Sequence, residues 1–205
     1  MTMCPALRRR FLLALLLAGT LLAAPALAAA QSADRAELHR QVLAVAPPGH
    51  DNDPLADTLT LPAERRLGQR TDFVAWRTRS GTGTEQERVT GVVLPVVTGR
   101  GYGGEIVLLV GIDHEGRVTG ARVLHHQESP GYGDGIEITH DDWIRQFEGR
   151  GLEDQDDAWA LRSDGGDFDT LSGATVTSRA VVHAVYQAVL YVERHRERLL
   201  DPAAR

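Results

Sequence analysis

The chain has 205 residues, a formal net charge of −6 and 42% apolar residues, which is the composition of an ordinary folded domain. The acidic balance and an aromatic content of 5% argue against a nucleic-acid-binding protein. All 22 basic residues are arginine, so a P-loop and lysine Schiff-base chemistry are excluded, and the single Cys4 excludes internal disulfides and cysteine-ligated clusters.

The N-terminus has the pattern of a membrane-targeting segment. Three arginines at residues 8–10 precede an apolar run over residues 11–30. A run of about 20 residues can cross a bilayer as an uncut anchor. The Ala-x-Ala triplet that ends at Ala28 equally fits a signal-peptidase site. In either case the rest of the chain is expected outside the cytoplasm, because the arginines stay inside.

Three regions follow from changes in composition along the chain. Residues 1–30 are the signal peptide or membrane anchor, residues 31–71 form a helix and a connector, and residues 72–200 form the main domain. Within the second region, the pattern predicts a short helix over residues 31–46, which a Pro-Pro-Gly turn ends. Residues 49–71 are polar and contain proline, which indicates a loosely packed connector.

The main domain begins with segments that have the β-branched, apolar pattern of strands. The expected strands are Asp72–Arg77, Arg88–Val97, Glu105–Asp113 and Arg117–His125. An Asp-His-Glu-Gly turn joins the last two into a hairpin. Pro95 lacks a backbone N–H and therefore suggests that its strand lies at an edge of the sheet.

Helical patterns dominate the C-terminal part of the chain. Ile136–Glu148 is expected to be helical, residues 150–170 to be an acidic surface loop, and Ser178–Leu199 to be a helix with a valine-rich core face. Strands followed by a packed helix predict an α+β fold, in which helices pack on an antiparallel sheet and an N-terminal apolar signal or anchor helix precedes the domain.

Two patterns that could bind cofactors lack the context they need. Gly99–Gly104 has the spacing G-x-G-x-x-G, but a strand follows it where a dinucleotide site requires a helix, so a glycine-rich turn is expected. His125-His126 and His140-Asp141-Asp142 do not predict a metal site. Neighbouring residues on a strand point to opposite faces, so the two histidines of the first pair cannot both ligate easily, and metal ligands must converge.

The segment from Asp169 to Ser178 brings small and hydroxyl-bearing residues to a helix start. Thr177 or Ser178 would serve as the N-cap. Free N–H groups and the positive end of the helix dipole make such a place receptive to a phosphate. The residues themselves leave two readings open, which are an anion site near Thr175 and a simple helix cap.

The pattern Asp169-x-x-Ser172-Gly173-Ala174-Thr175 resembles the D-x-x-[S/T]-G-A-[S/T] motif of FMN-binding domains that carry covalent flavin. The resemblance extends over residues 101–113 and 116–134, and to Ser-Arg-Ala-Val-Val after Thr177, within residues 72–195. Among these domains, the chain is most similar to the RnfG family of the Rnf electron-transport complex. It is more distantly similar to the NqrC family of the sodium-pumping NADH:quinone reductase.

The resemblance implies that FMN is joined by a phosphoester to the side-chain oxygen of Thr175. It also implies two further groups of cofactor-binding residues. Those around the phosphate and the ribityl chain would be Ser172, Gly173, Ala174 and Thr177; those in a loop near the flavin would be Glu128, Ser129, Pro130 and Gly131. The other reading of Glu128 is a solvated acid at the end of the hairpin. Tyr132, where the family usually has leucine, would reshape the pocket beside the flavin.

The function implied by the resemblance is that of an electron-carrying flavoprotein subunit of a membrane complex, which couples electron transfer to ion translocation. Its domain would lie on the periplasmic side of the bacterial inner membrane. Its partners would be the other subunits of an Rnf-type complex and, during maturation, a flavin transferase. No catalytic residue is expected, because the chain would be part of a translocase and not a stand-alone catalyst.

Two other functions stay open at this point. One is a free-standing extracytoplasmic FMN-binding protein, exported after cleavage near Ala28, which passes electrons to another redox partner. The other is a binding module without redox chemistry, whose helix start captures a phosphate or carboxylate.

Overall fold

The computed structural model describes residues 33–152 and 158–204. The apolar run over residues 11–30, and with it the expected signal or anchor helix, lies outside the described residues. Within the described ranges, no helix combines the length and the apolar character that crossing a membrane requires. The chain divides into two compact units, Met1–Arg40 and Gln41–Arg205. In the first unit, residues 33–40 are helical, as expected.

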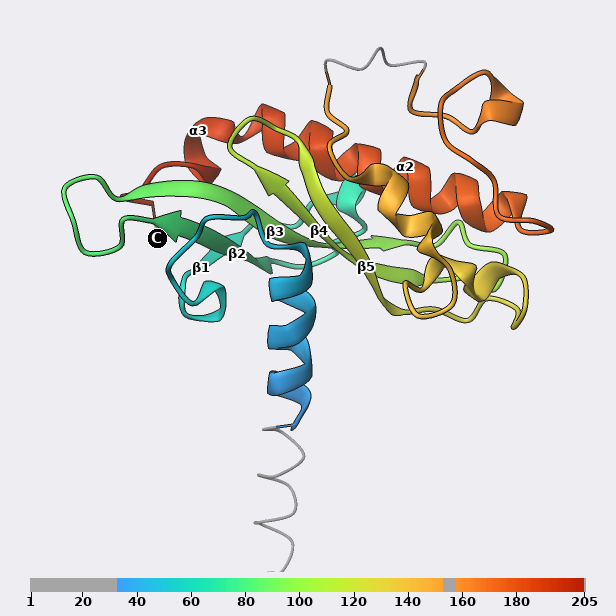
Figure 1. Ribbon diagram of the computed structural model, residues 1–205, viewed down its shortest axis with the longest axis horizontal. Coiled ribbons are helices and arrows are strands. Elements are labelled where there is room, and N and C mark those ends of the chain that lie inside the picture. The colour runs from blue at the N-terminus through green and yellow to red at the C-terminus, as the bar shows by residue number, and fades with distance from the viewer. Residues whose placement is uncertain (1–32, 153–157, 205) are drawn as a thin grey trace, which may run out of the picture. The chain divides into compact units, whose positions relative to one another are not determined.

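The second unit is built on one five-stranded antiparallel sheet, shown in Figure 1. Its strands pair in chain order, each with the next, so the sheet is a meander. The strands are β1 (Thr58–Leu61), β2 (Phe73–Ser80), β3 (Arg88–Thr98), β4 (Ile106–Asp113) and β5 (Val118–His125). The antiparallel sheet and the hairpin of the last two strands are therefore confirmed.

One long helix covers a face of this sheet. Helix α2 (Thr175–Arg194) packs on β3 and β4 and is followed by the short α3 (Arg196–Leu199). Its valines and alanines from Ala180 to Val192 recur at helical spacing and are buried, so the main core lies between α2 and the sheet. The shorter elements are 3-10 helices: η1 (Pro54–Ala56), η2 (Arg65–Leu67), η3 (Gly133–Ile136), η4 (Asp142–Phe147) and η6 (Arg162–Asp164). The α+β class is confirmed.

Residues 49–71 are not the loosely packed connector that their composition predicted. They contribute η1, β1 and η2, and Leu59, Leu61 and Leu67 are fully buried in the main core. The prediction was wrong because β1 is only four residues long and alternates threonine with leucine. Such an alternation buries every second residue on the sheet and leaves the threonines in solvent.

Pro95 does not lie in an edge strand, because β3 is the central strand of the sheet. The pairing of β2 with β3 runs only from Ser80↔Arg88 to Trp76↔Val93. At Pro95, β3 pairs with β4 through Leu109, and the side chain of Gln69 donates a hydrogen bond of 3.0 Å to the Pro95 carbonyl. The proline is tolerated because it sits where the β2 side of β3 is locally free.

The region between β5 and α2 also differs from expectation. Ile136–Glu148 is not one helix, because η3 and η4 are short and an extended Glu137 follows η3. The loop over residues 150–170 is anchored in the core through Trp159, Leu161 and Phe168, which are buried. The acidic composition of this segment obscured its buried apolar residues. The rings of Trp159 and Phe168 pack in a tilted arrangement with 5.1 Å between their centroids.

Candidate functional site

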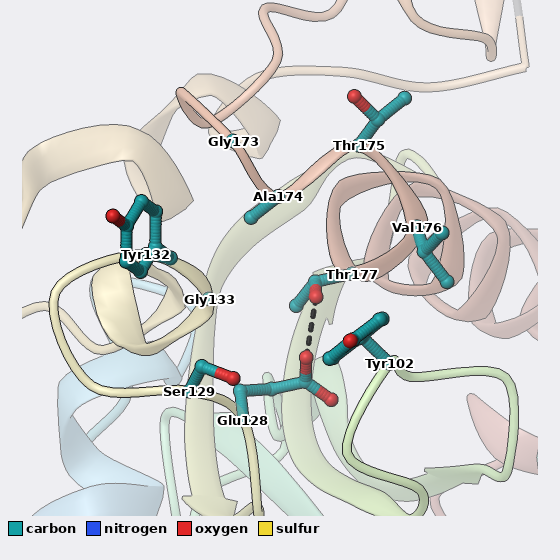
Figure 2. A pocket seen from close by; sticks show the side chains of 10 residues that line it. All are labelled: Tyr102, Glu128, Ser129, Tyr132, Gly133, Gly173, Ala174, Thr175, Val176 and Thr177. Atoms are coloured by element: carbon teal, nitrogen blue, oxygen red, sulfur yellow. Dashed lines mark hydrogen bonds between the residues drawn. The ribbon is translucent and has the colours of Figure 1, made fainter.

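Three loops meet at the N-terminal end of α2 and enclose a hollow of about 410 Å³. They are the glycine-rich loop between β3 and β4, the loop that follows β5, and the segment that leads into α2. Figure 2 shows the side chains around the hollow. The lining residues are Tyr102, Glu128, Ser129, Tyr132, Gly133, Gly173, Ala174, Thr175, Val176 and Thr177.

Helix α2 begins at Thr175, three residues before the predicted start. Ala174 is the N-cap and offers no side-chain hydrogen bond, so the expected caps Thr177 and Ser178 lie inside the first turn. The Ser178 hydroxyl donates to the Ala174 carbonyl at 3.0 Å and accepts from the Leu171 N–H at 3.1 Å. The first N–H groups of α2 therefore have no side-chain cap and remain available to an anion.

The segment that leads into α2 is held at its beginning by η4. The indole N–H of Trp143 donates to the Asp169 carbonyl at 2.7 Å, and the Asp169 N–H donates to the side-chain oxygen of Gln146 at 2.7 Å. Trp143 itself packs edge-on against Phe147, with 5.6 Å between the ring centroids. Both hydrogen bonds hold Asp169, so the segment is fixed at its start before it reaches Thr175.

The turn before Thr175 requires a glycine at position 173. Gly173 has φ +74°, a conformation that side chains rarely adopt. A Cβ atom at this position would lie 2.8 Å from the Tyr132 ring, which packs against the turn. Tyr132 is itself 62% exposed, so its ring forms one wall of the hollow and still faces solvent.

Glu128 connects the three loops from below the hollow. Its carboxylate is only 5% exposed, accepts from the Gly103 N–H at 3.0 Å and accepts from the Thr177 hydroxyl (Figure 2). The alternative of a solvated acid is therefore wrong. A Cβ at Gly103 would lie 1.9 Å from the Gln127 carbonyl, so the glycine-rich loop needs its glycine to come this close.

A histidine positions the backbone of Glu128. Nδ1 of His126 accepts from the Glu128 N–H at 2.9 Å, and Nε2 lies 2.7 Å from a Glu137 carboxylate oxygen. This arrangement requires the neutral tautomer with its proton on Nε2, because Nδ1 must accept. The loop after β5 is also held by Asp134, whose carboxylate accepts a hydrogen bond from the Gly131 backbone. This hydrogen bond lowers the pKa of Asp134.

Six of the nine expected cofactor-binding residues line the hollow. They are Glu128, Ser129, Gly173, Ala174, Thr175 and Thr177. The other three, Ser172, Pro130 and Gly131, are exposed and lie outside the lining set. Thr175, half-buried, stands at the rim above the Glu128–Thr177 hydrogen bond (Figure 2).

Sequence reasoning missed Tyr102, Gly133 and Val176 in this set. Tyr102 is 76% exposed, and in Figure 2 its ring lies across the hollow from Tyr132. The available signal was an aromatic residue inside a glycine-rich loop, where no core position exists to bury it. Val176 could have been found as an apolar residue next to the expected attachment point.

The charge around the hollow is low. Among the described residues that line it, Glu128 is the one carboxylate, and no arginine or histidine contributes. In the described parts of the chain, no group of three or more histidine, cysteine or acidic side chains could hold a metal ion. The uncapped end of α2 is therefore the local feature that favours an anionic group.

The sequence is 42% identical over 172 residues to the G component of the ion-translocating oxidoreductase complex of Pseudomonas aeruginosa, covering 83% of this chain and 78% of that protein. The chain belongs to this family, the RnfG family. The corresponding proteins of Cereibacter sphaeroides (48% identity over 154 residues, 75% of this chain and 66% of theirs) and Vibrio vulnificus (42% over 154 residues, 74% and 70%) are also similar.

Residues 101–190 of this RnfG family member match the model of the FMN-binding domain. That range contains every residue that lines the hollow. Among solved structures, the crystal structure of Shewanella oneidensis NqrC is similar with a TM-score of 0.45 and 23% identity, covering 71% of this chain and 65% of that chain. The family expected from the sequence motif is confirmed by the RnfG relatives.

Proposed function

We propose that this chain is the electron-carrying subunit of an ion-translocating oxidoreductase complex and that it holds FMN through a phosphoester to Thr175. The observation that carries this proposal is the position of Thr175 on the rim of a hollow, at the uncapped start of α2 and inside the FMN-binding match. The names of the relatives support the role in a complex.

The residues around the hollow suit this cofactor. A volume of about 410 Å³ is within the usual range for small-molecule sites. Tyr102 and Tyr132 offer two aromatic rings to a flat ring system, and Val176 adds an apolar surface. The phosphate would lie at the first turn of α2, where the helix dipole contributes about 0.3–1 kcal/mol. That contribution is small, so the covalent bond to Thr175 would be what retains FMN on the protein.

Thr175 acts as an acceptor and not as a catalyst in this proposal. Its Oγ forms a bond to the FMN phosphorus of FAD, the pyrophosphate bond breaks, and AMP leaves. The hydroxyl proton passes to a base of a separate flavin transferase, so this chain needs no general base of its own. Among the described residues that line the hollow, no histidine lies close enough to serve as one.

The chain's own residues would position the bound group. Bound flavin supplies one- and two-electron chemistry. Glu128 keeps the glycine-rich loop and α2 together through Gly103 and Thr177, which fixes the walls of the hollow. The Tyr132 ring leaves one side of the hollow open to solvent, where a redox partner can approach.

The proposal extends to the place of the domain in the cell. Residues 1–30 would anchor the chain in the bacterial inner membrane, with the domain on the periplasmic side beside the other subunits of the complex. The alternative is a free-standing FMN-binding protein released by cleavage near Ala28. N-terminal sequencing of membrane and soluble fractions separates the two, because an intact Met1 in the membrane fraction supports the anchor.

The attachment is tested by the intact mass of the full chain coexpressed with a flavin transferase. We expect a mass increase equal to one FMN less one water, and none in Thr175→Ala. Thr170→Ala is the matched control, because Thr170 is an exposed hydroxyl on the same segment and should leave the increase unchanged. An unmodified wild-type chain, or an increase that persists in Thr175→Ala, would show that the proposed linkage is wrong.

A further inference from the structure

A second hollow, of about 560 Å³, lies between η2, the end of β3 and the middle of α2. We call it the arginine groove. Three guanidinium groups, an imidazole, a hydroxyl and an amide line it together with apolar side chains, and the described lining contains no carboxylate. Its lining residues are Arg65, Arg66, Gly68, Val97, Thr98, Gly99, Arg100, His183, Ala184, Gln187 and Leu190.

The three arginines of the groove have no partner within the described part of the chain. No ion pair or side-chain hydrogen bond is formed by Arg65, Arg66 or Arg100, and all three are exposed. Other arginines are paired, for example Arg179 with Asp164 at 2.5 Å. The chain has a net charge of −6, whereas the groove holds unpaired arginines and no carboxylate. The charge of the groove is therefore positive, opposite to that of the chain as a whole.

The backbone that carries these arginines is fixed. Glu64 caps η2 by accepting from the Arg66 N–H at 3.0 Å, and the side chain of Gln69 bonds to β3. Gly68, at the end of η2, packs directly against the backbone of Val97. Helix η2 also contacts α2. The side chains of Arg65 and Arg66 can move, but the backbone that carries them is held in place.

The groove lies directly beside the proposed FMN site. Arg100 lines the groove and Tyr102, two residues later on the same loop, lines the first hollow. On α2, Val176 lines the first hollow, and His183 and Gln187 line the groove from the same helical face. Seven residues of helix separate Val176 from His183, a rise of about 10 Å.

His183 responds to the electrostatic field of the groove. Burial and, second, the positive charge of Arg100 lower the pKa of this imidazole. An anion placed in the groove would offset the charge of Arg100 and raise the pKa of this imidazole. The protonation of His183 thus reports whether an anion is bound.

We propose that the arginine groove docks an acidic segment of a partner protein next to the FMN site. Guanidinium groups form paired hydrogen bonds with carboxylates, and complementary charge steers partners together. Arg65 and Arg66 lie on η2, Arg100 lies on the loop after β3, and all three are exposed, which suits an extended chain. Val97, Ala184 and Leu190 would contact its apolar side chains. Only the partner's redox role rests on the proposed function, because docking itself requires no flavin.

The test measures binding of a fluorescein-labelled twelve-residue peptide of alternating glutamate and leucine to the full chain, by fluorescence anisotropy at low salt. The triple variant Arg65→Gln, Arg66→Gln, Arg100→Gln should bind at least about ten-fold more weakly, since charge pairing supplies the affinity. The control triple Arg88→Gln, Arg145→Gln, Arg162→Gln removes equal charge at exposed positions outside the groove and should bind nearly as wild type.

A second readout is the pKa of His183 by NMR, which should rise when the peptide binds to wild type and stay unchanged in the groove triple. Equal weakening by both triples would overturn the proposal, because binding would then follow net charge alone. Groove-dependent binding of phosphatidylglycerol vesicles or inorganic pyrophosphate, without peptide binding, would also overturn it. FMN content is read separately by intact mass, so loss of the Thr175 linkage would not change the peptide result.

Discussion

At the scale of single residues, Glu128 determines how the site is closed. A buried carboxylate is costly unless hydrogen bonds compensate it, and here the Gly103 N–H and the Thr177 hydroxyl do so. Thr177 is fully buried and Gly103 is half-buried. The carboxylate therefore joins the glycine-rich loop to α2 without any cofactor, and the walls of the hollow are in place beforehand.

We predict that Glu128→Ala lowers the free energy of unfolding by roughly 1–3 kcal/mol, because it leaves the buried Thr177 hydroxyl and the half-buried Gly103 N–H without an acceptor. Glu128→Gln should cost less, since its amide oxygen can still accept from one of them. Urea denaturation measures both. Glu105→Ala is the control, because Glu105 is an exposed acid on the glycine-rich loop that Glu128 contacts. If Glu128→Ala unfolded at the same urea concentration as the control, the bridging role would be wrong.

The residue scale was the least predictable from sequence. Glu128 reads as an ordinary loop acid, and its two partners lie 25 and 49 residues away along the chain. Nothing local indicates that three loops meet there. The motif around Thr175 was recognisable because its seven positions are contiguous, whereas Tyr102 enters the hollow from a loop more than seventy residues earlier.

At the scale of elements, the turn into α2 depends on the conformation of Gly173. We predict that Gly173→Ala destabilises the chain by about 1–2 kcal/mol through its left-handed backbone and displaces the Tyr132 ring. Gly165→Ala is the matched control: φ is +93° there, yet nothing lies within 4 Å of an added Cβ. Thermal unfolding compares the two.

The two glycine variants differ in what they disturb. Both should lose stability from backbone strain, but only Gly173→Ala should also reduce FMN incorporation, because its Cβ would meet the wall of the hollow. Equal incorporation in both variants would contradict the placement of Tyr132 beside the cofactor. The ratio of flavin absorbance to protein absorbance gives the measurement.

Elements with a long regular pattern were predictable, and short ones were not. The β4–β5 hairpin and the buried face of α2 follow from residue periodicity. The start of α2 was placed too late because Thr177 and Ser178 resemble caps, yet the Thr177 hydroxyl donates to Glu128 and the Ser178 hydroxyl donates to the Ala174 carbonyl. β1 was not predicted because four residues are too few to show a clear periodicity. The 3-10 helices after β5 were not predicted because they depend on tertiary contacts.

At the scale of the whole molecule, an ion-pair cluster ties the C-terminus to the start of the sheet. Arg77, only 2% exposed, donates to Asp57 at 2.7 Å and to the Asp201 carbonyl at 3.1 Å. Arg79 pairs with Asp57 and donates to the Pro202 carbonyl at 3.1 Å. One carboxylate thus holds two arginines that both reach the last residues of the chain.

This cluster makes stability depend on pH. Burial raises the pKa of Asp57, but the hydrogen bonds and charges of Arg79 and Arg77 outweigh burial, so the pKa is lowered. The unfolded chain therefore binds this proton more tightly than the folded chain. The stabilisation is complete above the unfolded pKa of about 4 and is lost as the pH falls through the lower folded value.

We predict that Asp57→Asn lowers the free energy of unfolding by roughly 1.5–3 kcal/mol at pH 7, because it removes hydrogen bonds to charged groups. The difference from wild type should narrow as the pH falls below about 4, because the unfolded wild-type chain takes up this proton before the folded chain does. Urea titrations at several pH values measure it. Asp142→Asn, which breaks an exposed pair with Arg145, should change stability by at most about 1 kcal/mol.

The order of the strands has a consequence for how the molecule is made. Each strand of the meander pairs with the one just before it, so a chain that emerges N-terminus first can add strands one by one. Helix α2 comes after all five strands, so the core between helix and sheet is complete only after α2 has been made. Thr175 reaches its final surroundings only at that step. Attachment of FMN to its oxygen would therefore identify a chain that has finished folding.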